Sequence, residues 1–131
     1  MFTIGQTGTA SLIVTPEKTA QAVGSGLLPV FGTPYLVALM EEAAVNCLQA
    51  QLSPEQGSVG TGIAVEHSSP TPIGMSVTAT AVITAVAENG RWVEFAVSAE
   101  DACGAIGKGT HRRAIIHNEK FLAKCNQKAK Q

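Results

Sequence analysis

Residues 34–52 read PYLVALMEEAAVNCLQAQL, and this stretch decides the fold. It contains no glycine, and its one proline stands at the first position, where a missing N–H costs no hydrogen bond. Thr33 can cap the start, and Ser53-Pro54 ends the stretch because a residue before proline avoids helical geometry. The stretch therefore predicts one helix about 28 Å long. Apolar residues cover most of its circumference, so we expect it to be largely buried.

On either side of this helix the sequence changes to the period of two that is typical of β-strands. We expect a short strand over 11–14 before the helix and, after it, strands over 59–67, 75–87, 91–100 and 105–116. Turn residues separate them, and the strongest turn is Asn89-Gly90, a pair favoured in tight hairpins. This order predicts an α+β fold, with one long helix against a mostly antiparallel sheet and the four later strands in a meander.

The composition limits both the size and the partners of the protein. We take residues 1–131 as a single domain, because the chain is too short for two. Only 15% of the side chains are charged, against about 25% in a typical soluble chain. An apolar surface and a free sheet edge together predict a homodimer. The net charge of −1 argues against nucleic acid as a partner.

The sequence also bears on location and on metals. No apolar run approaches the ~18 residues of a membrane span, and residues 1–14 lack the features of a signal peptide. We therefore expect a cytoplasmic protein with no membrane partner. The widely spaced Cys47, Cys103 and Cys125 predict free, buried thiols rather than a disulfide framework or a zinc site. The three histidines are too scattered for a metal motif, so we expect no metal.

Glu41 is the most informative residue of the helix. Its helical neighbours are all apolar, namely Val37, Ala38, Ala44 and Val45. A carboxylate alone among such neighbours is costly, so the pattern indicates either a functional carboxylate or a helix rotated to let the side chain reach water. Glu42 has polar helical neighbours and is predicted to be an ordinary solvated acid.

Two further residues are candidates for chemistry. Alternation along 59–67 places His67 at the end of one strand face, together with Val59, Thr61, Ile63 and Val65. This position suits a general base or a structural histidine. Thr33 has a hydroxyl at the start of the helix, where it could face a developing oxyanion, act as a nucleophile or only cap the helix. Removal of His111 or His117 is expected to change the rate little.

Five motifs occur together in this sequence: 30–37 (VFGTPYLV), Glu41, 60–67 (GTGIAVEH), 71–79 (TPIGMSVTA) and 109–113 (GTHRR). In this combination they resemble the fluoroacetyl-CoA thioesterase-like branch of the hotdog-fold thioesterases, over about residues 11–124. The resemblance implies a hotdog fold, in which an antiparallel sheet wraps around one long central helix. It also implies a homodimer that hydrolyses a small acyl-CoA to the free acid and coenzyme A.

The resemblance implies roles for individual residues. The family's catalytic threonine, glutamate and histidine fall on Thr33, Glu41 and His67. Gly60 falls on the backbone contact to the thioester oxygen, and a substrate-binding arginine falls on Arg112 or Arg113. Coenzyme A is implied only as part of the substrate, and no cofactor is implied. The segment 20–29 is glycine-rich and lacks aromatic residues, so selectivity for a fluorinated acyl group is not expected.

Helical geometry separates two of these residues. Thr33 and Glu41 lie about 12 Å apart along the helix axis, so His67 must lie between them or the site must use two subunits. In the expected mechanism His67 is the general base for Thr33 or a water, Glu41 orients the imidazole, and the Gly60 N–H stabilises the oxyanion. Attack by Glu41, or by a water that Glu41 activates, stays open. The alternative functions are a non-catalytic acyl-CoA binding or sensing module and a dehydratase.

Overall fold

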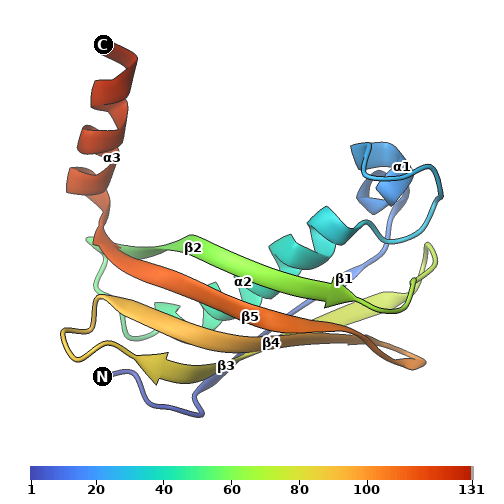
Figure 1. Cartoon of the computed structure of the whole chain (residues 1–131), viewed down its shortest axis with the longest axis horizontal. Coiled ribbons are helices and arrows are strands. Elements are labelled where there is room, and N and C mark those ends of the chain that lie inside the picture. Colours follow the sequence, from blue (N-terminus) through green and yellow to red (C-terminus); the bar gives the residue numbers. More distant parts are fainter. Residues whose placement is uncertain (131) are drawn as a thin grey trace.

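One helix, α2 (Thr33–Gln49), packs against one face of a five-stranded antiparallel sheet (Figure 1). The computed structural model describes residues 1–130. The strands are β1 (Thr7–Ile13), β2 (Gln56–His67), β3 (Ser76–Val86), β4 (Trp92–Asp101) and β5 (Gly104–His117). Short helical segments precede α2, at Pro16–Lys18 and in α1 (Ala20–Val23), and α3 (Asn118–Asn126) and a last turn (Gln127–Lys130) follow β5. This arrangement confirms the predicted α+β class.

The order of strands in the sheet is β1-β3-β4-β5-β2. The expected meander is therefore correct only for β3, β4 and β5. The expectation that β2 would join it is wrong, because β2 pairs with β5 at the edge opposite β1. Helix α2 separates β1 from β2 in the sequence and carries the chain across the sheet. The strands before and after the helix, β1 and β2, therefore form the two edges of the sheet.

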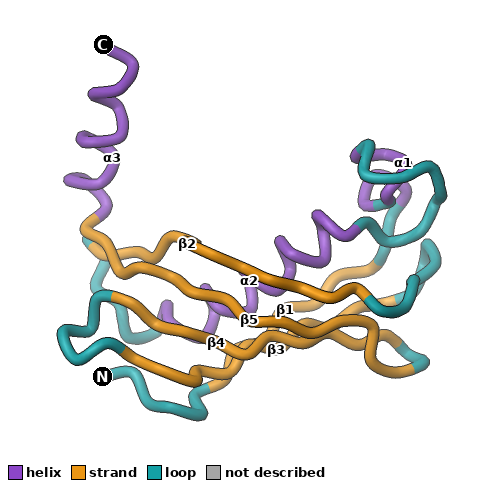
Figure 2. Tube along the Cα trace, in the orientation of Figure 1, coloured by secondary structure: helices purple, strands orange, loops and turns teal. Residues whose placement is uncertain are grey.

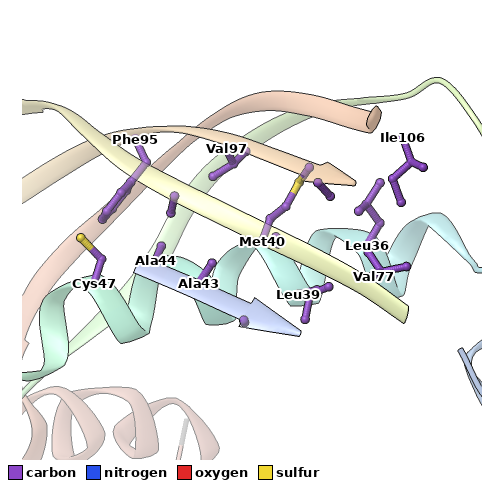
Figure 3. Close-up of a cluster of buried hydrophobic side chains, with 14 of the residues drawn as sticks. Leu36, Leu39, Met40, Ala43, Ala44, Cys47, Val77, Phe95, Val97 and Ile106 are labelled. Carbon is purple, nitrogen blue, oxygen red and sulfur yellow. The ribbon is translucent and has the colours of Figure 1, made fainter. Parts of the chain in front are cut away.

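The core lies between α2 and the sheet (Figure 3). Leu36, Met40 and Ala44 of the helix belong to one buried cluster with Phe95 and Val97 of β4, and Leu36 lies at the end of the cluster near Ile106 of β5. At the β1 side the helix backbone lies directly on Gly8, where a Cβ atom would overlap the Ala43 carbonyl. Only a residue without a side chain allows this close approach.

Helix α2 differs from its prediction in three ways. Gly32, in extended geometry, precedes the first helical residue, so Thr33 lies inside the helix and does not cap it. The helix ends at Gln49 rather than at residue 52, because the bonds from Gln51 N to Leu48 O and from Leu52 N to Gln49 O tighten the chain into turns. Its buried residues form one stripe, so in a single chain the opposite face is exposed and the expected burial over most of its circumference is wrong.

The remaining features lie outside the core. Helix α3 projects away from the sheet and carries its lysines in solvent (Figure 2). Cys47 is buried, but Cys103 and Cys125 are exposed, so the expectation of buried thiols is wrong for these two. Their positions, at a turn and on the projecting helix, place them outside the packed layer. Within residues 1–130, no helix combines the length and the apolar character needed to cross a membrane.

Candidate active site

The structure brings Thr33 and His67 together although 34 positions separate them in the sequence. Thr33 Oγ1 of the first turn of α2 lies 2.8 Å from His67 Nδ1 at the end of β2. The Thr33 hydroxyl therefore serves the histidine and not the helix terminus. When the imidazole carries its proton on Nε2, Nδ1 can accept the hydroxyl proton, as a general base does.

The surroundings of His67 favour its neutral form. Burial lowers the pKa of the imidazole, and the nearby backbone of Ser69 partly offsets this effect. The edge of the Phe31 ring faces the imidazole, with the ring centroids 6.4 Å apart. His67 Nε2 is buried and has no hydrogen-bond partner among residues 1–130. A neutral imidazole beside a hydroxyl is suited to take a proton near neutral pH.

A cavity of ≈ 260 Å³ adjoins the Thr33–His67 pair. Besides these two residues it is lined by Ala20, Ser25, Val30, Phe31, Ser68, Ser69 and Pro70. The segment 20–29 contributes only Ala20 and Ser25 to the lining, so it places no aromatic ring in the cavity. Small side chains from this segment therefore line one side of the cavity next to His67, the candidate base.

Glu41 belongs to a second group of residues. Its Oε2 lies 3.0 Å from Nη1 of Arg113, a buried residue of β5. Arg113 is held in turn by Ser58, through Nε to the hydroxyl at 2.9 Å and Nη2 to the carbonyl at 3.0 Å. The Glu41 side chain is 38% exposed. The carboxylate is therefore paired and partly hydrated, which offsets the cost that its apolar helical neighbours would otherwise impose.

A β-bulge places Gly60 beside Glu41. Gly60 pairs with Arg113 and Gly62 with Arg112, so Thr61 is an extra residue in β2. The bulge reverses the alternation of side chains along β2. The prediction that Val59 and Thr61 share a face with Ile63 is therefore wrong. Gly60 instead faces α2, where a Cβ atom would lie 2.6 Å from Glu41 Oε2.

The two candidate arginines lie on opposite faces of the sheet. Arg113 points toward α2 and Glu41, whereas Arg112 pairs with Glu94 on the outer face. The Arg112 guanidinium also lies over the Trp92 ring, 4.5 Å from its centroid. Consecutive residues of a strand alternate between faces, so only one of the two can meet the helix.

Within one chain the sequence candidates thus form two separate groups. Thr33 and His67 make one, and Glu41, Gly60 and Arg113 make the other. Within residues 1–130 no hydrogen bond joins Glu41 to His67, so the expected contact between them is absent from the single chain. The described residues contain no cluster of three His, Cys, Asp or Glu side chains suited to hold a metal ion.

The sequence placed His111 outside the candidates and predicted that its removal would change the rate little, yet the residue is buried beside Glu41 and Arg113. One signal in the sequence could have indicated it. His111 lies two residues before Arg113, and residues two apart in a strand share a face. Once Arg113 is a candidate for the helix side of the sheet, His111 becomes one as well.

Gly60 and Gly62 provide a matched test of the bulge. We expect Gly60→Ala to lower kcat at least tenfold, because the new methyl group must displace the Glu41 carboxylate. Gly62→Ala should keep the wild-type rate, because a Cβ there meets no atom within 4 Å. Steady-state kinetics of both variants tests this prediction, and circular dichroism verifies that both variants fold. Equal rates would show that the space at Gly60 has no bearing on turnover.

Comparison with known proteins places the chain in a family. The family model described as fluoroacetyl-CoA-specific thioesterase matches residues 14–119. A fluoroacetyl-CoA thioesterase of Streptantibioticus cattleyicolor is 41% identical over 131 residues, covering 95% of this chain and 93% of that protein. A solved structure of a fluoroacetyl-CoA thioesterase aligns with a TM-score of 0.91 and 40% identity over 98% of both chains.

Two more solved structures share the fold of this chain. A mutant fluoroacetyl-CoA-specific thioesterase, in complex with fluoroacetate and CoA, aligns with a TM-score of 0.85 and 40% identity over 92% of this chain and 99% of that one. A thioesterase superfamily member of Thermus thermophilus shares the fold, with a TM-score of 0.90 and 24% identity over 99% of this chain and 95% of that one. The family resemblance and the hotdog fold predicted from the motifs are confirmed. This chain belongs to the fluoroacetyl-CoA-specific thioesterase family and is a thioester hydrolase with the hotdog fold.

Proposed function

We propose that this thioesterase hydrolyses a small acyl-CoA to the free acid and coenzyme A at Thr33, His67 and Glu41. The observation that carries the proposal is the 2.8 Å contact between Thr33 Oγ1 and His67 Nδ1 beside a cavity of ≈ 260 Å³. The limited volume of the cavity favours a short acyl group, and the small Ala20 and Ser25 side chains of segment 20–29 offer no aromatic ring to select a fluorine substituent. No cofactor takes part, because coenzyme A enters as part of the substrate, and the cytoplasm is the proposed location.

The proposed reaction begins with proton transfer to His67. The imidazole takes the proton of Thr33, or of a water held at this place, as the oxygen attacks the thioester carbon. The Gly60 N–H, which lies in the group of Glu41 and therefore comes from the second copy of the chain, stabilises the negative charge on the carbonyl oxygen. The C–S bond then breaks, and the imidazolium returns its proton to the departing sulfur of coenzyme A. If Thr33 attacked, a water deprotonated by His67 releases the acid from the acyl-threonine in a second step.

Glu41 enters this reaction through a second copy of the chain. We propose a homodimer in which the exposed face of α2 and the free edge of β2 are covered by the partner. An unpaired edge strand and the partly exposed, charged Glu41 support this arrangement. The carboxylate of one copy then adjoins the Thr33–His67 pair of the other, where it orients and stabilises the imidazolium. Arg113 holds Glu41 in place for this contact.

The activity test is thiol release from a panel of short acyl-CoAs. We expect release of free coenzyme A with acetyl-CoA and other short-chain esters, and loss of release in Thr33→Val, which keeps the shape but removes the hydroxyl. Tight binding without release would favour the binding or sensing module. Loss of water from a 3-hydroxyacyl-CoA would favour the dehydratase.

Sedimentation equilibrium at micromolar concentration tests the dimer. We expect a species of twice the 13.5 kDa chain mass, and a 13.5 kDa monomer would contradict the proposal. Mixing inactive Thr33→Val and Glu41→Gln chains then tests whether the site is shared. In the mixed dimer one of the two sites regains both native residues, so the mixture should recover up to about a quarter of the wild-type rate. No recovery after verified chain exchange would show that each site lies within one chain.

A further inference from the structure

His111 is the most completely buried ionisable group outside the residues with proposed roles. The residue is 3% exposed, and it projects from β5 toward α2. Its ring stacks on Phe95 of β4, with centroids 6.1 Å apart and planes inclined by 27°. Two polar contacts hold it: Nδ1 lies 2.8 Å from the Gly62 carbonyl oxygen, and Nε2 lies 3.2 Å from Arg113 Nη1.

These contacts determine where the imidazole proton lies. A carbonyl oxygen only accepts hydrogen bonds, so Nδ1 must carry the proton and donate it to Gly62. A guanidinium only donates, so Nε2 must be the unprotonated acceptor for Arg113. Arg113 Nη1 has two N–H bonds, and it directs one to His111 and the other to Glu41 Oε2 at 3.0 Å. Every polar atom of the neutral ring is thereby satisfied.

We propose that His111 is a positioning residue for the thioesterase reaction, holding Arg113, and through it Glu41, at the bulge that carries Gly60. The inference rests on the proposed role of Glu41. Gly62, whose carbonyl accepts the His111 bond, and Gly60 flank the extra residue of the bulge. A Cβ atom on Gly60 would lie 3.3 Å from His111 Cε1. His111 therefore touches both the backbone that holds Gly60 and the guanidinium that holds the carboxylate.

Protonation of His111 would break this network. The imidazolium presents an N–H at Nε2 toward the N–H of Arg113, so the acceptor is lost and two positive charges face each other. Burial lowers the pKa of His111, the charge of Arg113 lowers it further, and the Gly62 hydrogen bond and Glu41 raise it. The groups around the ring are Glu41 from α2, Arg113 from β5, the Gly62 carbonyl from β2 and the uncharged Phe95 from β4.

Two substitutions separate the two nitrogen atoms of His111. In His111→Asn the side-chain amide takes the place of Nδ1 and can still donate to Gly62, but nothing accepts from Arg113. In His111→Gln the amide oxygen takes the place of Nε2 and can accept from Arg113. We expect kcat to fall at least tenfold in His111→Asn with KM within about twofold, and to stay within about threefold in His111→Gln. His117→Gln, at the exposed end of β5, is the matched control and should keep the wild-type rate.

The pH profile gives a readout that a packing role would not change. As pH falls, kcat/KM of the wild-type enzyme should decline with the uptake of two protons, one by His67 and one by His111. In His111→Gln the decline should follow a single proton. An unchanged slope, or a wild-type kcat in His111→Asn, would overturn the proposal.

Nitrogen-15 NMR can be recorded on the wild-type enzyme, so this test does not depend on whether a variant folds. The His111 ring should show the Nδ1–H tautomer at neutral pH, and the Nε2–H tautomer would overturn the network. Glu41→Gln separates this proposal from the one on which it rests. If Glu41→Gln keeps the wild-type rate, the role of Glu41 fails and His111 has nothing to position. If Glu41→Gln is inactive while His111→Asn is fully active, only the positioning role of His111 fails.

Discussion

Replacing Glu41 with glutamine should lower kcat by about 10²–10⁴-fold, because this carboxylate orients and stabilises His67, whose positioned proton transfer is typically worth that much. Glutamine keeps the shape of the side chain, and its amide oxygen can still accept the 3.0 Å bond from Arg113. The fold should therefore survive, and only the negative charge is lost. Thiol release from a short acyl-CoA, measured beside the thermal midpoint of unfolding, separates the two effects.

Glu42→Gln is the control that the chain itself provides. Glu42 is the next residue of α2, yet it is exposed and makes no ion pair among residues 1–130. Its variant should keep the wild-type rate. If Glu41→Gln and Glu42→Gln turn over substrate equally well, Glu41 is a structural partner of Arg113 and takes no part in the chemistry.

His67→Ala should also lose about 10²–10⁴-fold in rate, because it removes the proposed general base. The pH dependence of the wild-type enzyme has a defined sign. A general base works only when neutral, so the rate is retained above its pKa and lost as the pH falls through it. Burial lowers the pKa of His67, which places its contribution to this loss below the ordinary histidine value of about 6.5. Rate measurements from about pH 4 to about pH 8, which extend well below the ordinary histidine value, reveal this loss of rate.

His117→Ala serves as the control for His67. His117 is exposed, and its Nδ1 accepts a hydrogen bond from the Lys120 N–H at the start of α3, away from the Thr33–His67 pair. We expect the rate of His117→Ala to stay within about a factor of ten of the wild-type rate, which corresponds to ~1.4 kcal/mol in the activation free energy. A His67→Ala variant with the wild-type rate and pH profile would assign proton transfer to Glu41 or to a water that it holds.

Features set by local periodicity could be predicted from the sequence. The uninterrupted stretch at 34–52 predicted α2, and the two-residue period over 91–100 predicted β4, whose Val93, Phe95 and Val97 are buried. The motifs that flank α2 also indicated Thr33 and His67, which the structure brings to 2.8 Å. Helix and strand formation depend on residues a few positions apart, so a single sequence contains the necessary information.

The details of the second group needed the tertiary structure. The bulge at Thr61 turned Gly60 toward the helix, whereas simple alternation had placed Thr61 with Ile63. The partner of Glu41 is Arg113, 72 positions away, and the buried ring of His111 completes the group. Such contacts depend on strand order and register, and β2 reaches β5 only because α2 crosses the sheet.

Local patterns and motifs were sufficient for the α+β class, the central helix and the family of this protein. The three-dimensional arrangement was needed to show that Arg113 rather than Arg112 meets Glu41, and that Glu41 and His67 lie in separate groups within one chain. The choice between the two arginines follows from the two-residue period of a strand. One inserted residue moves every side chain that follows it in the strand to the opposite face of the sheet. The local sequence does not show which register the neighbouring strand will impose.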